Sequence, residues 1–417
     1  MRLQVIAAAI MLSSGCSAPL APQDVQARLE SLAAQSDTAG LVSLANGQCK
    51  GEERPSCLED FFLTLAANKR VALALGALER LGAGDENVVR DGHGLTHVIG
   101  IRAWKPGDDV AAVFRSCNGL YQSGCYHGVI QAYLTADGTL DSLRAVQLCD
   151  KVAAAAADRW LRFQCVHGLG HGFEMAQAWE LPRALEKCDW LGDSWDRESC
   201  YGGAFMENAV ASHPGGHHTS ARALAATTDT APAAQHDDHG SHSPDPSVIT
   251  FRMRDSTDAL YPCTIVDARY LRSCYQVQGG IILNAKGQDF TQAAKECDRV
   301  ESVWRSECYL SLGTNASAAS AMSASRAISL CSTGDPAYQP WCIVGAVKNF
   351  IDVTARAEDG VKFCREVKSG DNRSKCWIAV GEQIATLHPT DPEKRTRECA
   401  RAPEDGVAEC RRAAYLQ

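Results

Sequence analysis

Eighteen of the nineteen cysteines form nine close pairs along the chain, and this spacing limits the fold more than any other feature. In the C-terminal half, the first cysteines of successive pairs lie 34, 34, 33 and 35 residues apart. A fixed period in this range is typical of stacked helical hairpins. The sequence therefore predicts an all-α solenoid in which each pair closes its own hairpin. The predicted pairs are Cys49 with Cys57, Cys117 with Cys125, Cys149 with Cys165, Cys188 with Cys200, Cys263 with Cys274, Cys297 with Cys308, Cys331 with Cys342, Cys364 with Cys376, and Cys399 with Cys410.

One unit shows how a hairpin is built. Asp289 is a suitable N-cap for a first helix, helix A, with the sequence FTQAAKECDRV, and a second helix, helix B, contains RSECYLSL. Its two cysteines lie where the antiparallel helices come close. Each bridge closes a loop of about 11 residues and stabilises the fold by roughly 3 kcal/mol on the chain-entropy model. We expect about ten repeats of about 34 residues, including one without cysteines between Leu73 and Pro106.

The period and the cysteine pairing resemble those of cysteine-rich Sel1-like and tetratricopeptide-like repeat proteins. The resemblance covers most of residues 40–415. It implies stacked helical hairpins and a general habit of binding, but no particular reaction. The cysteine spacing here is usually longer than in those proteins, and the Cys-x-His-Gly motif of this chain is not part of their patterns.

The N-terminus predicts export. Arg2 precedes an apolar stretch from Val5 to Leu12, so residues 1–16 are a signal peptide. The sequence Ser-Ser-Gly-Cys ending at Cys16 resembles a bacterial lipoprotein cleavage box, and we favour lipidation of Cys16 over plain secretion. The remaining eighteen cysteines suit an oxidising compartment. We therefore expect a periplasmic protein or an outer-membrane-anchored lipoprotein that meets the membrane only through this lipid.

The rest of the chain divides into three segments. Histidine-bearing repeats fill residues 20–210, and further repeats fill residues 251–417. Residues 211–250 are rich in Ser, Ala, Pro, Asp and His, and we expect a disordered insert there because Cys200 and Cys274 are 74 residues apart. The insert serves either as a flexible metal-capturing tract or as a solvated linker. It carries His213, His217, His218, His236, His239 and His242.

Composition excludes two classes of partner. The net charge is −9 with no long basic run, which argues against binding of nucleic acid. No stretch after residue 20 reaches the roughly 18 consecutive apolar residues of a membrane span.

Histidines recur in register when each helix B is numbered from its cysteine as zero, with Asp91 taking that place in the unit without cysteines. Offset +2 holds His93, His127 and His167, and offset +6 holds His97, Gln131 and His171. At 100° per residue these offsets face away from the cysteine. Neighbouring helices pack roughly 8–10 Å apart, so we expect the five histidines to form one patch across three repeats. The glycines at +3 suggest close helix packing.

The sharpest motif is His167, His171 and Glu174, spaced i, i+4, i+7 along one helical stripe. Two imidazoles one turn apart can share a metal, and two histidines with a carboxylate match non-haem iron and several zinc sites. We expect a divalent transition metal, Zn, Fe or Cu, with Glu174 as a ligand or a catalytic general base. Because ligating imidazoles must be neutral, affinity is expected to fall as pH drops through about 6.5. For Glu207 we favour a structural role facing its hairpin partner over a ligand role.

Two functions follow from these patterns. We favour an exported metal-binding solenoid and leave open whether it is a hydrolytic or oxidative metalloenzyme. Metal-free acid–base or ligand-binding work and purely structural hydrogen bonding are weaker interpretations of the histidines. The alternative from another class is an envelope scaffold that binds a protein or peptide without catalysis.

Overall fold

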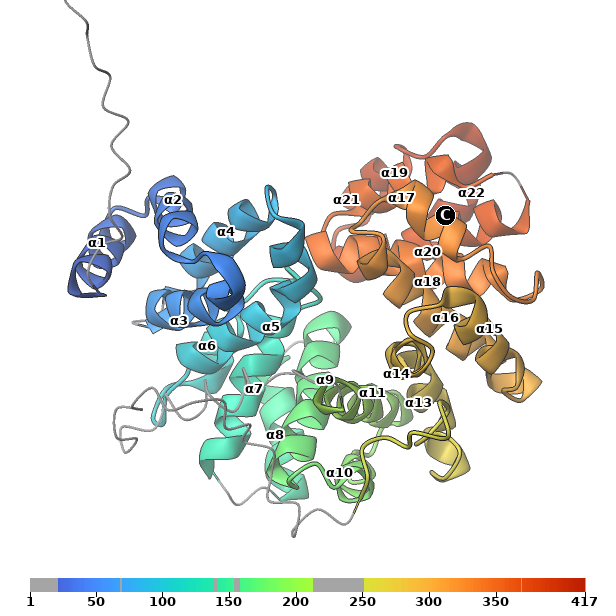
Figure 1. Cartoon of the computed structure of the whole chain (residues 1–417), viewed down its shortest axis with the longest axis horizontal. Coiled ribbons are helices and arrows are strands. Elements are labelled where there is room, and N and C mark those ends of the chain that lie inside the picture. Colours follow the sequence, from blue (N-terminus) through green and yellow to red (C-terminus); the bar gives the residue numbers. More distant parts are fainter. Residues whose placement is uncertain are drawn as a thin grey trace, which may run out of the picture.

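The chain folds into an all-α solenoid. The computed structural model describes residues 22–67, 70–137, 141–153, 158–212, 251–368 and 370–416, and every regular element in these ranges is a helix (Figure 1). The predicted signal peptide, Cys16 and the predicted insert except Ala211 and Ser212 lie outside the described residues. None of the described helices combines the length and apolar character needed to cross a bilayer.

Helical hairpins follow one another along the described chain, after a first helix α1 (Pro22–Ala34). The A helices are α2 (Thr38–Gln48), α4 (Val71–Gly82), α6 (Val110–Phe114), α8 (Ser142–Val152), α10 (Leu181–Cys188), α15 (Phe290–Asp298), α17 (Ala324–Leu330), α19 (Ala357–Glu366) and α21 (Pro392–Cys399). The B helices are α3 (Arg54–Ala66), α5 (Glu86–Ala103), α7 (Gly124–Asp137), α9 (Arg159–Ala176), α11 (Ser194–Ala211), the consecutive pair α13 (Leu271–Val277) and α14 (Gly279–Ala285), α16 (Ser302–Ala319), α18 (Gln339–Thr354), α20 (Asp371–Leu387) and α22 (Glu404–Ala413).

The B helices pack directly on one another in chain order, so they form a continuous row that the A helices flank. Short 3-10 turns, η1 (Gly51–Glu53) and η3 (Ala268–Tyr270), precede α3 and α13.

One prediction is wrong in detail. Turns, not a helix A, lead to Cys263, so that unit has a helical second half only.

All nine predicted cysteine pairs are disulfides within their own units, with Cα–Cα distances of 5.4–5.7 Å. The local pairing expected from the spacing is therefore confirmed throughout. The bridges join Cys49 to Cys57, Cys117 to Cys125, Cys149 to Cys165, Cys188 to Cys200, Cys263 to Cys274, Cys297 to Cys308, Cys331 to Cys342, Cys364 to Cys376, and Cys399 to Cys410.

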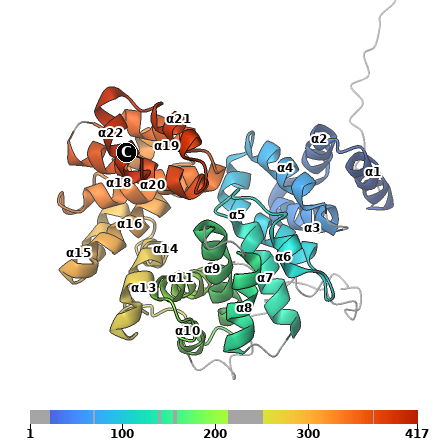
Figure 2. The ribbon, with the colours of Figure 1, turned by 180° about the vertical axis from the view of Figure 1, so that it is seen from behind.

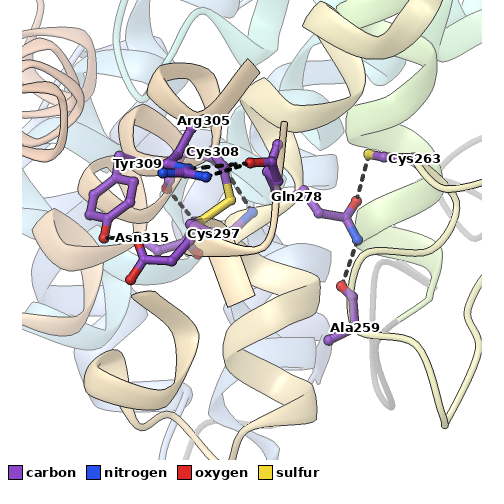
Figure 3. Close-up of a disulfide and its surroundings, with 12 residues drawn as sticks. Ala259, Cys263, Gln278, Cys297, Arg305, Cys308, Tyr309 and Asn315 are labelled. Carbon is purple, nitrogen blue, oxygen red and sulfur yellow. Dashed lines mark hydrogen bonds between the residues drawn. A yellow bond between two sulfur atoms is a disulfide. The ribbon is translucent and has the colours of Figure 1, made fainter. Parts of the chain in front are cut away.

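Figure 3 shows the bridge between Cys297 and Cys308, which joins α15 to α16 beside Tyr309. The Tyr309 hydroxyl donates to the Asp298 carboxylate over 2.7 Å and ties the same two helices together. Asp289 caps α15 as predicted, because its side chain accepts from the backbone N–H groups of residues 291 and 292. A cap, a disulfide and a hydrogen bond thus define this hairpin.

Several B helices end in the same turn. Residues 13 and 14 after the cysteine of helix B have left-handed backbones at Ala178/Trp179, Gly287/Gln288 and Ala321/Met322. The N–H of the second residue of each pair donates to a carbonyl five residues back, as in a Schellman motif. The turn reverses the chain towards the next helix A at the same point of successive repeats.

Glycines allow the B helices to touch backbone to backbone, as the glycine pattern at +3 predicted. A Cβ atom on Gly203 would lie 2.0 Å from the carbonyl oxygen of His167, and one on Gly345 would lie 1.9 Å from that of Leu310. Helix α9 stays continuous through its own glycines. Glycine costs helix stability, but here it lets imidazoles on neighbouring helices come within reach of one another.

The same contacts correct the predicted register of α5. In α11 and α18, the glycine at +3 packs on the carbonyl at +2 of the preceding helix B. Gly128 packs in this way on His97, and a Cβ atom on Gly100 would lie 2.1 Å from the Cys125 carbonyl oxygen. His97, not His93, is therefore the counterpart of His127 and His167. The alignment of Asp91 with the cysteines is wrong by one helical turn, because the unit has no cysteine to fix it.

The solenoid curves until its C-terminal half touches its N-terminal half. In Figures 1 and 2, the C-terminal repeats lie next to the region of α4 and α5 in both views. The backbone N–H groups of Tyr121 and Gln122 donate to the carbonyls of Val353 and Asp352, both over 2.8 Å, and the Gln122 side chain bonds Asn349. The turn before α7 is thus held by the C-terminal end of α18.

Candidate metal centre

Five histidines from α5, α7 and α9 converge on one cluster. His97, His127, His167 and His171 are at most 7% exposed, and His93 is half-buried at the rim. Two groups of three have ligating atoms within 4.8 Å of one another. We name His93, His97 and His127 the outer triad, and His127, His167 and His171 the inner triad. The predicted patch is therefore present as a set of side chains close enough to share a metal ion.

His127 occupies the middle of the cluster. Its ring centroid lies 5.8 and 5.4 Å from those of His93 and His97, and 4.9 and 5.1 Å from those of His167 and His171. The rings of His97 and His171 also meet, at 5.3 Å. The imidazoles of α5 and α9 thus flank the single histidine of α7.

Backbone carbonyls orient the two end members. The Nδ1 of His93 lies 2.9 Å from the Tyr121 carbonyl oxygen, and the Nδ1 of His167 lies 3.1 Å from that of Ser199. A carbonyl oxygen only accepts hydrogen bonds, so Nδ1 carries the proton in both rings. The lone pair is then on Nε2, the usual arrangement for a metal-binding histidine with a hydrogen-bonded second nitrogen.

A chain of side chains orients His97 and His171. The Glu207 carboxylate accepts from the Nδ1 of His171 over 2.8 Å and from the Gln131 amide nitrogen over 3.4 Å. The Gln131 amide oxygen therefore faces the Nδ1 of His97, at 2.8 Å. Both histidines carry their proton on Nδ1, so their lone pairs are also on Nε2.

His127 is held the opposite way round. Its Nε2 lies 3.1 Å from the amide oxygen of Gln164 and donates to it. Its Nδ1 is buried and makes no hydrogen bond with any described residue. A buried lone pair without a partner costs free energy unless a ligand satisfies it.

Burial keeps these imidazoles neutral. Desolvation lowers the pKa of His93 to about 4, even though the Tyr121 carbonyl favours its charged form. Desolvation, with the neighbouring histidines adding to it, also holds the pKa values of His127 and His167 well below the ordinary 6.5. Three of the five rings are thus unprotonated at neutral pH, as metal binding requires.

Glu174 is part of neither triad. The side chain is fully buried, and neither carboxylate oxygen bonds a described residue. Burial raises its pKa well above the ordinary value, and the nearby Glu207 and Glu180 raise it further. Burial thus favours the neutral form of Glu174, and the set of His167, His171 and Glu174 expected from the helical stripe is not among the groups that could share an ion.

Glu207 is the carboxylate that does reach the cluster, and its predicted orientation is wrong. It faces His171 on α9, not its hairpin partner α10. The glycine spacing in the sequence could have predicted this orientation. Gly203 packs on α9, and Glu207 follows it by four residues, so the two share a helix face.

Comparisons with protein-family models, curated proteins and solved structures gave no match.

Proposed function

We propose that this protein is an exported solenoid that holds a divalent transition-metal ion between the histidines of α5, α7 and α9. One observation carries the proposal. The Nε2 atoms of His93 and His97 lie 3.1 Å apart while the Nδ1 of each ring faces an oxygen. Both Nε2 atoms then present lone pairs to each other, which is repulsive unless a cation binds both. Two nitrogens on a tetrahedral zinc ion are about 3.3 Å apart, from Zn–N distances of about 2.0–2.1 Å.

The donor set narrows the metal. Each triad offers imidazole nitrogens alone, and imidazole binds zinc, copper, nickel and iron. A non-haem iron site of the facial type needs a carboxylate as well, and Glu174 lies outside both triads. Of the three metals expected from the sequence, the geometry supports Zn and Cu over Fe.

The burial of the histidine cluster favours metal binding over catalysis on a large substrate. Only His93 has appreciable exposure, so a reactant would have to be small enough to enter beside it. The raised pKa of Glu174 favours its protonated form, which cannot accept a proton, and this argues against the catalytic base role expected from its position.

Nine disulfides support an oxidising location outside the cytoplasm. Attachment through a lipid on Cys16 and a place in the periplasm or at the outer membrane complete the proposal. They rest on the N-terminal sequence.

Elemental analysis tests the function directly. The full chain is purified without an affinity tag, with the six histidines of residues 211–250 replaced by serine in every sample. His97→Ala/His127→Ala should lose the bound metal, because this change removes ligands of both triads, and His388→Ala, at the end of α20 and outside the cluster, should keep it. Equal metal content in the double variant and its parent would reject the proposal, and the scaffold alternative would then lead.

A further inference from the structure

The two triads differ in their access to solvent. If the proposed function holds, this difference sets the order in which an ion reaches them. The outer triad contains the half-buried His93, whereas all three members of the inner triad are buried. An ion arriving from solvent meets the outer triad first. An ion in the inner triad is enclosed by imidazoles and helix backbone.

His127 is common to both triads, but it offers a single lone pair. Its Nε2–H donates to Gln164, so only Nδ1 can bind a metal. The two triads therefore cannot both be completed at the same time by this ring. They are alternative positions for an ion, not two independent sites.

We propose that the cluster is a relay for a single divalent ion, which loads in the outer triad and then passes to the inner triad while His127 stays bound. In the transfer, the bonds from the Nε2 atoms of His93 and His97 break as bonds from the Nε2 atoms of His167 and His171 form. The bond to the Nδ1 of His127 remains, no proton moves and no electron is transferred.

The arrangement of the flanking pairs suits such an exchange. His127 lies at similar distances from the two pairs, and the rings of His97 and His171 are in contact, so the ion moves a short way between them. The protons that stay on the four flanking rings are each fixed by an oxygen, from Tyr121, Gln131, Ser199 and Glu207. Each pair is thus ready to bind without rearranging its hydrogen bonds.

Loading kinetics test the relay, with Co²⁺ as the probe in the full chain lacking the insert histidines. His93→Gln/His97→Gln should keep the inner site but load about tenfold more slowly or worse, because the ion must then wait for the fold to open. His167→Gln/His171→Gln should load Co²⁺ at the parent rate. It should release Co²⁺ to a chelator at least about tenfold faster than the parent does. His127→Gln should lose both positions.

Circular dichroism of each variant checks that it folds, and X-ray absorption on the unmutated cluster needs no variant at all. Three imidazole nitrogens around cobalt support the relay. Four or five imidazoles, equal loss of equilibrium affinity in both double variants, or two cobalt ions per chain would overturn it. Absence of any bound Co²⁺ in the parent would reject the proposed function itself, whereas binding with unchanged loading rates would reject only the relay.

Discussion

The backbone N–H of Tyr121 donates to the carbonyl of Val353 over 2.8 Å, which joins the turn before α7 to the end of α18. The carbonyl of the same Tyr121 accepts from His93. Tyr121, Gln122 and Ser123 all have positive φ, at 47°, 57° and 64°. A non-glycine residue with this left-handed backbone conformation costs about 1–3 kcal/mol and persists only when its surroundings hold it in place. The C-terminal repeats therefore hold a backbone turn that orients one histidine of the outer triad.

Loosening this turn should weaken metal binding. Gln122→Ala removes the side-chain bond to Asn349, a loss of about 1 kcal/mol that would lower affinity by up to about fivefold if fully transmitted to His93. A metal titration of the variant measures this. Gln276→Ala is the matched control, because Gln276 is a half-buried glutamine that bonds Glu307 away from the turn. Equal affinities in the two variants would show that the turn does not act on the site.

Removing the Glu207 carboxylate should weaken metal binding, although Glu207 is not itself a member of either triad. Glu207→Ala leaves the Nδ1 of His171 and the Gln131 amide without their acceptor. The ring of His171, and that of His97 behind Gln131, then lose their fixed orientation. Loss of such an outer partner typically lowers metal affinity by about 10–100-fold. Competition with a chelator of known affinity measures the change. Glu198→Ala, at an exposed position of the same helix, is the control, and Glu207→Gln should restore part of the loss.

The sequence was enough to predict the hairpins, the disulfides and the convergence of five histidines, because cysteine pairs fix the register of each repeat. It failed where that marker was missing. In α5, Gly94 falls at +3 when Asp91 is taken as zero, and only the contact of Gly128 with the His97 carbonyl shows that His97 takes the +2 position instead. The turn at Tyr121 has no local signal, since it depends on α18, more than 200 residues later in the sequence.

The pH dependence of binding should differ from the expectation for free imidazoles. Burial lowers the pKa of His93 to about 4 and that of His127 well below 6.5, so protons compete poorly with a metal in the folded protein. Affinity should change little between pH 7 and about 5.5 rather than fall through about 6.5. Co²⁺ titrations at several pH values test this. A steep loss centred near 6.5 would mean that the rings are more accessible to water than their burial indicates.

The last prediction concerns Glu174, whose pKa is raised well above its ordinary value by burial. An acid with a raised pKa in the folded state binds more protons there than in the unfolded chain. The stability that it contributes is therefore present at low pH and is lost as pH rises above about 4.5. Glu174→Gln keeps the shape and removes this penalty, so the variant should gain stability relative to the parent as pH rises from 5 to 8.

Urea unfolding of the metal-free protein at both pH values measures this gain, and metal content should not change because Glu174 lies outside both triads. A stability difference that is the same at pH 5 and pH 8 would show that the carboxyl is not held neutral. Loss of metal in Glu174→Gln would instead place its carboxylate among the ligands, and the all-imidazole site proposed here would have to be redrawn.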